Sequence, residues 1–287
     1  MREYLVRVDT QDGLQLDGAL KQPGRRRKRR LAVDAMVLVH GNGGNFYHRS
    51  MFDEYGDKLA ALGCAALRIN TRGHDMIAHT TGNGDYRRSG TTYEVIEECR
   101  LDLRAWVAWL RASGHESIGL WGHSLGAVKS IYYMALERDA KVRAVVATSP
   151  PRFSYRAFSA MSEGQEFVRL FTQMRRLVEE GKPQTIVDVM VPYPYVATAG
   201  QYVEKYGPEE RYNFLAYLPR VRCPLLVTIG TAEAETLMTF RGLPQEVRET
   251  IGQHPNVSFA SIPGADHFYS EQRAQLWEVV ETWLAKL

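Results

Sequence analysis

A serine flanked by glycines lies in the sequence GHSLG at residues 122–126, a GxSxG pattern. An apolar stretch, residues 118–121, precedes it, and the helix-like sequence AVKSIYYMALER follows it. A serine between a strand and a helix must occupy a sharp turn, and glycines two residues to either side permit a backbone approach that a Cβ would block. Such a turn presents the hydroxyl above the sheet, so the pattern predicts Ser124 as a nucleophile.

A serine hydroxyl is a poor nucleophile at neutral pH unless a base removes its proton during attack. His267, in the sequence IPGADHFY, follows the last apolar stretch and precedes a C-terminal helical pattern. Because loops that follow parallel strands gather at one edge of a sheet, we expect His267 to reach Ser124 as general base. We expect His123, beside the nucleophile, to point away from it, and keep His123 only as a candidate for substrate contact.

A carboxylate is needed to orient the histidine and to stabilise its protonated form. The loop after the apolar sequence LLVTIG carries two glutamates and no aspartate, in GTAEAE at residues 230–235. We predict Glu233 as the acid and keep Glu235 as the alternative. Asp266 also competes, although side chains of adjacent residues seldom meet in the required geometry.

Acyl transfer also needs hydrogen-bond donors for the oxyanion of its tetrahedral intermediate. The backbone N–H of Leu125 is one candidate, because it follows the nucleophile at a helix N-terminus. The other is Asn42, in the loop HGNGGN at residues 40–45. These glycines do not form a nucleotide-binding motif, since GxxxxGK is absent and Phe46 occupies the third glycine position of GxGxxG.

The residues just described need a scaffold, and apolar runs typical of buried strands recur along the chain. They comprise residues 35–39, 65–69, 118–121, 142–147, 225–229 and 257–262. Helical patterns fill most of the gaps, including an amphipathic one over residues 93–112. Alternating stretches on either side of Gln11-Asp12-Gly13 predict an N-terminal hairpin, residues 4–10 and 14–21. Together these patterns predict an α/β fold.

About seventy residues separate two of the core strands, which is too long for a simple connection. We therefore predict a core formed by residues 1–150 and 220–287, and a helical lid formed by residues 151–219. The lid is rich in tyrosine, and Tyr195 is our candidate there for substrate contact; Gly43 and Tyr47 are further candidates in the first loop. Tyrosines facing the site would favour an aromatic or amphipathic group.

The composition excludes several other classes of protein. Of 287 residues 45% are hydrophobic and 24% charged, with no apolar run of the roughly 18 residues that a membrane span needs. Three well-separated cysteines form no disulfide pattern, which predicts a cytoplasmic protein. The net charge of +3 depends on the run RRRKRR at residues 25–30, which we interpret as a solvated loop, not as a nucleic-acid site. The sequence leaves a homodimer open.

The motifs VLVHGNGGN, INTRGHD, LWGHSLG, LLVTIGTAE and PGADHF resemble the α/β-hydrolase superfamily in type and order. They span residues 35–287, nearly the whole chain. The resemblance implies a mostly parallel eight-stranded sheet with helices on both faces, a lid after the sixth strand, and no metal or organic cofactor. HGNGGNFY with NTRGHD is also similar to a subgroup that contains siderophore-ester hydrolases. The glutamate in place of the family's usual aspartate leaves the identity of the acid open.

The sequence thus predicts a serine hydrolase that cleaves a small-molecule carboxylic ester through an acyl-enzyme. Thioester hydrolysis, acyl transfer and hydrolysis of a C–C bond use similar machinery and stay as alternatives. A noncatalytic binding protein on the same fold is an alternative of another class, although this chain keeps both the serine and the histidine. The NTRGHD turn, residues 70–75, is expected to brace the loops around the oxyanion site.

Overall fold

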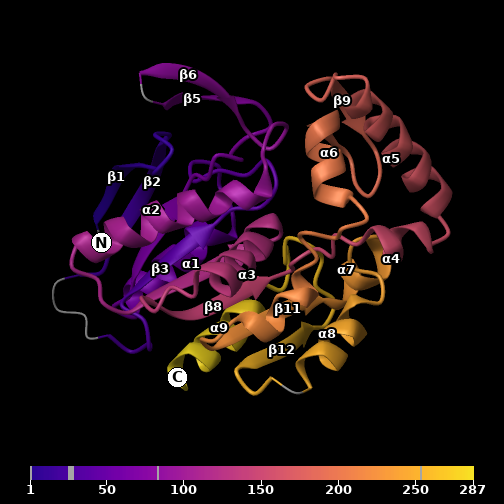
Figure 1. The fold of residues 1–287 in the computed structure, drawn as a ribbon. Coiled ribbons are helices and arrows are strands. Elements are labelled where there is room, and N and C mark those ends of the chain that lie inside the picture. The colour runs from indigo at the N-terminus through magenta and orange to yellow at the C-terminus, as the bar shows by residue number, and fades with distance from the viewer. Residues whose placement is uncertain (1, 25–28, 83, 253) are drawn as a thin grey trace.

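The computed structural model describes residues 2–24, 29–82, 84–252 and 254–287. Eight strands form one sheet in the order β1-β2-β4-β3-β7-β8-β11-β12 (Figure 1). They are β1 (Arg2–Asp9), β2 (Gln15–Gln22), β3 (Ala35–Val39), β4 (Ala65–Ile69), β7 (Ile118–His123), β8 (Val142–Thr148), β11 (Leu225–Gly230) and β12 (Val257–Ile262). Pairing is parallel from β4 to β12 and antiparallel at β1 and β2. The predicted mostly parallel eight-stranded sheet is confirmed.

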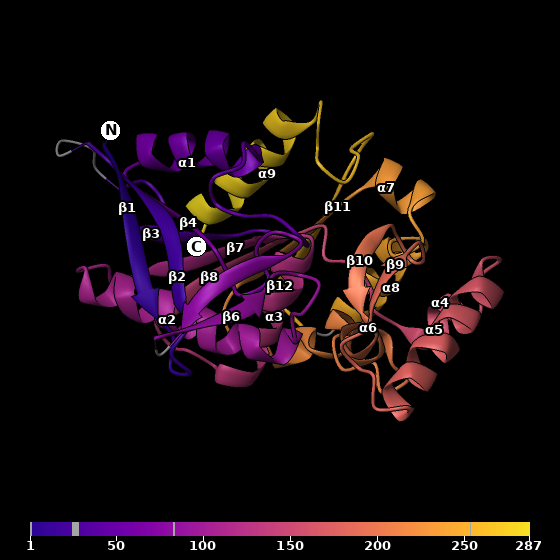
Figure 2. The same ribbon diagram turned by 90° about the horizontal axis from the view of Figure 1, so that it is seen from above.

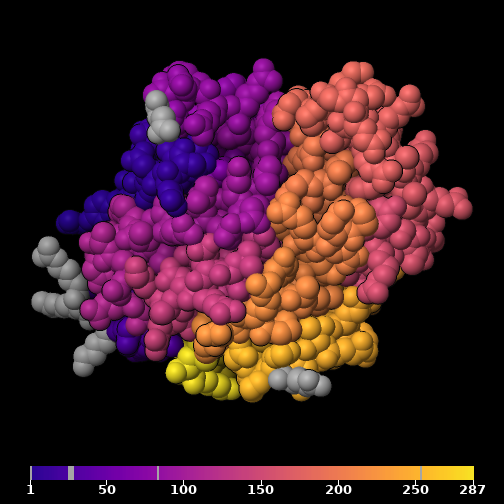
Figure 3. All heavy atoms as spheres, in the orientation of Figure 1, coloured from indigo at the N-terminus to yellow at the C-terminus, as the bar shows by residue number. Residues whose placement is uncertain are grey.

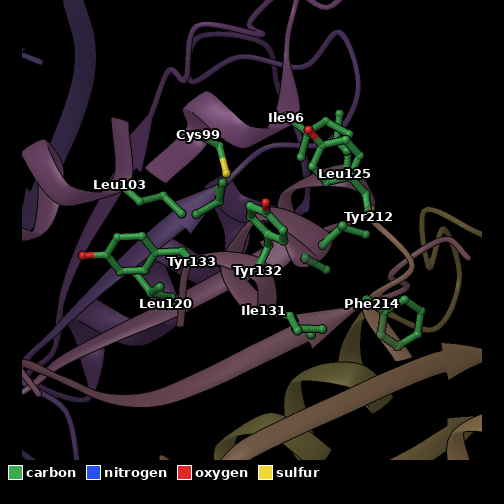
Figure 4. Packing of buried hydrophobic residues seen from close by; sticks show 14 of the residues in the cluster. Ile96, Cys99, Leu103, Leu120, Leu125, Ile131, Tyr132, Tyr133, Tyr212 and Phe214 are labelled. Carbon is green, nitrogen blue, oxygen red and sulfur yellow. The ribbon is translucent and has the colours of Figure 1, made fainter. Parts of the chain in front are cut away.

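Helices cover both faces of the sheet (Figure 2). On one face lie α1 (Met51–Ala61) and α9 (Arg273–Ala285), and on the other α2 (Cys99–Ala112), α3 (Leu125–Glu137) and α8 (Leu243–Ile251). Each layer buries its own hydrophobic cluster against the sheet, as the amphipathic patterns require. On the α3 side, Ile131, Tyr132 and Tyr133 pack among residues of α2 and of the segment near residue 212 (Figure 4).

The parallel strands end at one edge of the sheet, and the loops that follow them form the candidate site. Strand β7 lies between β3 and β8 in register, with Val39 opposite Gly122 and His123 opposite Thr148. The ends of these strands therefore bring the first loop and the GHSLG turn together.

Residues 151–219, here called the insertion, follow β8. They contain α4 (Tyr155–Ser159), α5 (Gly164–Glu179), α6 (Ala199–Tyr206), the 3-10 helices η2 (Phe214–Ala216) and η3 (Leu218–Arg220), and a hairpin of β9 (Ile186–Val189) and β10 (Tyr195–Thr198). The insertion is bonded to the core, because Thr198 N donates to Thr92 O and Thr92 Oγ1 donates to Val196 O, both at 3.0 Å. Figure 3 shows the two parts in contact.

Some local predictions were wrong. The helix expected over residues 93–112 begins with a 3-10 turn, η1 (Ile96–Glu98), and becomes α-helical only from Cys99. Before it lies an unpredicted hairpin, β5 (Ala78–Gly82) and β6 (Asp85–Ser89), whose polar side chains lack an apolar alternation. A short helix, α7 (Thr231–Thr236), follows β11 directly. Much of the basic run, residues 25–28, lies outside the described residues.

Within the described part of the chain, no helix combines the length and apolar character needed to cross a membrane.

Candidate active site

The GHSLG turn holds Ser124 in a left-handed backbone conformation, with φ of 54° and ψ of −124°. The two glycines explain how the turn is possible. A Cβ on Gly122 would lie 2.1 Å from the carbonyl oxygen of Gly126, and a Cβ on Gly126 would lie 2.2 Å from the carbonyl oxygen of Val39. Side chains at these positions would force β7, α3 and β3 apart, and the hydroxyl of Ser124 would lose its position.

Ser124 and His267 meet as expected, although 143 residues separate them. Ser124 Oγ lies 3.0 Å from Nε2 of His267, and Nδ1 of His267 lies 2.7 Å from Oε2 of Glu233. A carboxylate only accepts hydrogen bonds, so the proton of the neutral imidazole is on Nδ1. Nε2 is then free to accept the serine proton, which is the arrangement that general-base catalysis requires.

Glu233 is the carboxylate that contacts the histidine, and it lies in the first turn of α7 with only 1% of its surface exposed. Its other oxygen, Oε1, accepts from Gly230 N at 2.7 Å and from the hydroxyl of Ser149. The hydroxyl of Tyr269 supports Ser149 at 2.8 Å. Sequence reasoning missed Ser149 and Tyr269; Ser149 is signalled only by being the polar residue next to the end of β8.

The two competing carboxylates lie elsewhere. Glu235 is exposed and has no bond to the imidazole. Asp266 accepts from the backbone N–H groups of Phe268 and Ser270 at 3.0 and 2.9 Å, so it shapes the loop that carries His267. These bonds contribute to holding the pKa of Asp266 below its usual value, against the opposing effect of burial.

His123, kept above as a candidate for substrate contact, has no hydrogen bond to the Ser124 hydroxyl among the described residues. Its ring lines the same cavity as Ser124, and its centroid lies 4.9 Å from that of His267. Nε2 of His123 donates to the backbone oxygen of His267 at 2.8 Å, since a carbonyl can only accept. Burial and the neighbouring His267 lower the pKa of His123 to about 3, so it is neutral and positions the histidine loop.

The loop at residues 40–45, here called the oxyanion loop, lies against the nucleophile. A Cβ on Gly41 would be 2.9 Å from Cβ of Ser124, so only glycine permits this approach. The N–H of Asn42 has no acceptor among the described residues, and Leu125 begins α3, where an N–H has no partner within the helix. Asn42 follows Gly41 in the chain and Leu125 follows Ser124, so their assignment as oxyanion donors stays a prediction.

A series of buried hydrogen bonds supports the oxyanion loop. His40 Nε2 accepts from Thr71 N at 3.1 Å, so its Nδ1–H donates to the carbonyl of Gly41 at 2.8 Å. A trans peptide directs its C=O and N–H oppositely, so this bond orients the N–H of Asn42. Lys129 donates to Thr71 Oγ1 at 3.0 Å and pairs with Glu94, both fully buried. Burial and the charge of Lys129 lower the pKa of His40 to about 3.

The NTRGHD turn braces the same loop from its outer side. Asn45 donates to Asp75 Oδ1 at 2.6 Å, and Asp75 N donates to Gly44 O at 3.0 Å. Tyr47 also bonds to Asp75, and its side chain is 54% exposed. Tyr47 is therefore held outside the cavity, contrary to its prediction as a substrate contact. Gly43 is outside as well, with a φ of +63° and Met76 packed against it.

A cavity of about 820 Å³ opens at Ser124. It is lined by the oxyanion loop, the start of α1, the histidine loop, the segment after α7 and the hairpin of the insertion, which contributes Tyr193 and Tyr195. Tyr195 thus lies where the sequence placed it, in the cavity wall. Most of the exposed surface of the cavity wall is apolar, and Met51, Phe52, Phe240 and Phe268 are among the residues that line it. Such walls suit the hydrocarbon part of a ligand.

An unexpected lysine lies behind this wall. Lys205, on α6, is 1% exposed, and no carboxylate lies within 4.0 Å of it in the described part of the chain. Its ammonium lies 5.0 to 5.6 Å from the ring centroids of Phe153, Tyr193 and Tyr206 and 4.9 Å from that of Tyr195. It donates to Tyr193 at 3.0 Å and to Oδ1 of Asn42 at 3.4 Å. Aromatic faces stabilise the cation here.

No cluster of three or more histidine, cysteine, aspartate or glutamate side chains that could hold a metal occurs among the described residues. The arrangement in the cavity is suited to chemistry by side chains and backbone donors: a polarised hydroxyl, a base with a fixed tautomer, and two N–H groups beside them.

Comparison with known proteins gives a consistent picture. A model described as the alpha/beta hydrolase family matches residues 36–279. No curated protein matches the sequence.

Solved structures similar to this chain include Est1E from Butyrivibrio proteoclasticus with bound ferulic acid, at a TM-score of 0.67 and 16% identity over 98% of both chains. A soluble variant of monoglyceride lipase from Saccharomyces cerevisiae, in complex with a substrate analogue, has a TM-score of 0.68 and 14% identity, over 97% of this chain and 94% of that one. The esterase Pf2001 from Pyrococcus furiosus has a TM-score of 0.62 and 20% identity, over 99% and 92%. At such identities these similarities concern the fold alone.

Proposed function

Because the chain belongs to the alpha/beta hydrolase family, we propose that it hydrolyses a carboxylic ester through an acyl-enzyme. Ser124 attacks the ester carbonyl, His267 takes the proton of the serine and later gives it to the leaving alcohol, and Glu233 orients the imidazole. The observation that carries this proposal is the hydrogen-bonded chain from Ser124 through His267 to Glu233, with distances of 3.0 and 2.7 Å.

The negative charge that develops on the carbonyl oxygen is stabilised by the N–H groups of Asn42 and Leu125. Removing one such donor from a serine hydrolase typically slows turnover by about 100-fold or more. In the second half of the reaction His267 activates a water molecule, which attacks the acyl-enzyme and releases the acid. The insertion covers the cavity as a lid, and Tyr195 contacts the substrate from that side.

A fluorophosphonate probe tests the nucleophile directly. The wild-type protein should form a covalent adduct at Ser124, located by mass spectrometry of the labelled peptide, and Ser124→Ala should form none. A noncatalytic binding protein would leave Ser124 unlabelled, and that result would refute the proposal.

A substrate panel then tests the bond that is cleaved. Esters and thioesters of matched acyl length are compared, with an alcohol and an amine as acceptors and Ser124→Ala as control. If only thioesters are turned over, the protein is a thioesterase. If acyl transfer is faster than hydrolysis, it is an acyltransferase, and either result would refute ester hydrolysis as the main activity.

The cytoplasm is the proposed location. Cys64, Cys99 and Cys223 are all free thiols, which fits a reducing compartment.

A further inference from the structure

Four charged side chains line the cavity, two of each sign, and they differ in their partners. Among the described residues that line it, the side chains with full charges are Arg49, Arg273, Glu233 and Asp266. Both carboxylates are occupied, since Glu233 accepts from the imidazole, Gly230 and Ser149, and Asp266 accepts from backbone N–H groups of its own loop. The positive charges of the two arginines are therefore not balanced by a free carboxylate in the wall.

Neither arginine has an ionic partner. In the described part of the chain, no carboxylate oxygen lies within 4.0 Å of Arg49 or Arg273. Arg49 is exposed, whereas the more deeply buried Arg72 and Arg152 are paired with Asp102 and Glu246. Arg273 is half-buried, and its Nε is a buried donor without a hydrogen-bond partner. Arg273 lines the cavity, so its guanidinium is available to an acceptor that binds there.

The two arginines enter the cavity from the same layer of the fold. Arg49 immediately precedes Ser50, the N-cap of α1, and Arg273 is the first residue of α9; these helices cover the same face of the sheet (Figure 2). Their neighbours Met51 and Phe52 also line the cavity, whereas Tyr193 and Tyr195 come from the insertion. The starts of α1 and α9 thus bring both arginines to the cavity from the same layer.

We propose that the ester substrate carries a negatively charged carboxylate, and that Arg49 and Arg273 bind it while the reacting carbonyl lies at Ser124. This inference rests on the proposed function and adds the class of substrate to it. Guanidinium groups pair with carboxylates through two parallel hydrogen bonds, which fixes orientation as well as charge. Lys205, behind the wall and without a carboxylate partner, adds a field of the same sign.

Matched pairs of substrates test this inference, each pair differing only in a carboxylate or a neutral carboxamide. With the charge on the alcohol side, 4-acetoxybenzoate is compared with 4-acetoxybenzamide. With the charge on the acyl side, monoethyl adipate is compared with the ethyl ester of adipic acid monoamide. In at least one pair we expect kcat/KM to be about tenfold or more higher for the carboxylate, as hydrogen bonds to a charged group suggest.

In the double variant Arg49→Gln/Arg273→Gln, kcat/KM for the carboxylate should fall to about that for the carboxamide, because the ion pair between guanidinium and carboxylate is lost. Arg143→Gln is the matched control, since Arg143 is an exposed arginine on β8 that lies outside the cavity lining. It removes one positive charge and should preserve the preference. Equal turnover of both members of each pair by wild type, or a preference that survives in the double variant, would overturn the inference.

A binding measurement separates this inference from the proposed function. Adipate and benzoate, with adipamide and benzamide as neutral controls, are tested for protection of Ser124 against a fluorophosphonate probe and for a shift in Tm. If no ester is hydrolysed but the carboxylates bind and the double variant loses that binding, the anionic site stands and ester hydrolysis fails. Equal binding of acids and amides by wild type would reject the anionic site itself.

Discussion

Nζ of Lys205 lies 3.4 Å from Oδ1 of Asn42, so a side chain of the insertion reaches the loop that carries a proposed oxyanion donor. Thr91 donates to the same oxygen. Asn42 is therefore held by two donors from two segments, one in the core and one in the insertion. This contact makes the position of the oxyanion loop depend on the insertion.

Replacing Lys205 by methionine should slow the chemical step more than it weakens binding. Displacing a catalytic group by a fraction of an ångström is costly, and we expect kcat to fall about tenfold with a smaller change in KM. The measurement is steady-state kinetics on a neutral ester. Lys182→Met, which changes an exposed lysine of the insertion that pairs with Glu180, is the control. A rise in KM at constant kcat would show that Lys205 serves substrate binding and not the position of the loop.

Combining Lys205→Met with Asn42→Ala tests whether the lysine acts through Asn42. Asn42→Ala keeps the backbone N–H but removes the oxygen that Lys205 contacts. If the lysine acts by this route, its substitution should have little further effect on kcat in the alanine background. Additive losses would mean that Lys205 acts by another route.

Glu233→Gln should lower kcat by about 10³- to 10⁴-fold, because an amide does not hold the histidine in the tautomer that accepts the serine proton. Glu235→Gln, two residues along the same short helix, changes an exposed side chain and should retain wild-type turnover within about twofold. Rates of acylation of the two variants, measured by stopped flow, would show which glutamate is the acid. Comparable losses in the two variants would argue against Glu233 as the acid.

Replacing either of two glycines by alanine should change the free energy of unfolding, but in opposite directions. Gly126→Ala places a Cβ 2.2 Å from the carbonyl oxygen of Val39, and we expect it to lower the free energy of unfolding by about 1–3 kcal/mol and to impair turnover. Gly56→Ala, within α1, places a Cβ at an ordinary 3.6 Å from Ala66 and should raise stability by up to about 1 kcal/mol. Urea denaturation measures both. A tolerated Gly126→Ala would contradict the steric account of the turn.

His40 and His123 should make the fold acid-sensitive. The pKa of each falls from 6.5 to about 3 on folding, chiefly because burial disfavours the charged form. Their stabilising contribution is therefore fully present above pH 6.5 and is lost as the pH falls toward 3. Between pH 6.5 and 3 the unfolded chain binds up to two protons more than the folded protein does. Each unit by which the pH falls in this range therefore lowers the free energy of unfolding by up to about 2.7 kcal/mol.

Urea denaturation between pH 7 and pH 4.5 measures this slope. His123→Asn should reduce the contribution of the two histidines by about half, since one of the two protons is then absent. A slope unchanged by this substitution would show that His123 is not held neutral in the folded protein.

Much of this molecule could be predicted from its sequence, for physical reasons that differ between elements. Strands buried on both faces produce continuous apolar runs, so residues 35–39 and 65–69 were placed with their observed limits. The limits of the edge strand, residues 257–262, also agree with the prediction. The β5–β6 hairpin was missed because its side chains are mostly polar and its pairing depends on contacts distant in sequence.

In the candidate site, too, some residues could be predicted from the sequence and others could not. Ser124 and His267 were found because their chemistry requires a recognisable turn and a strand-end loop. Ser149 and Lys205 were not, since a serine after a strand and a lysine in a helix have no special pattern until the fold brings them to Glu233 and Asn42. The bond from His123 to the backbone of the histidine loop could not be predicted either, because it joins segments that only the fold brings together.

Two buried lysines support the oxyanion loop. Lys129 of α3 acts through Thr71, and Lys205 of α6 contacts Asn42 directly. A chimera that kept this core but took its insertion from a relative would retain the first attachment and lose the second. Exchange of the insertion should therefore alter reaction rate as well as selectivity, and engineers who swap it would need to carry Lys205 and its aromatic surroundings along.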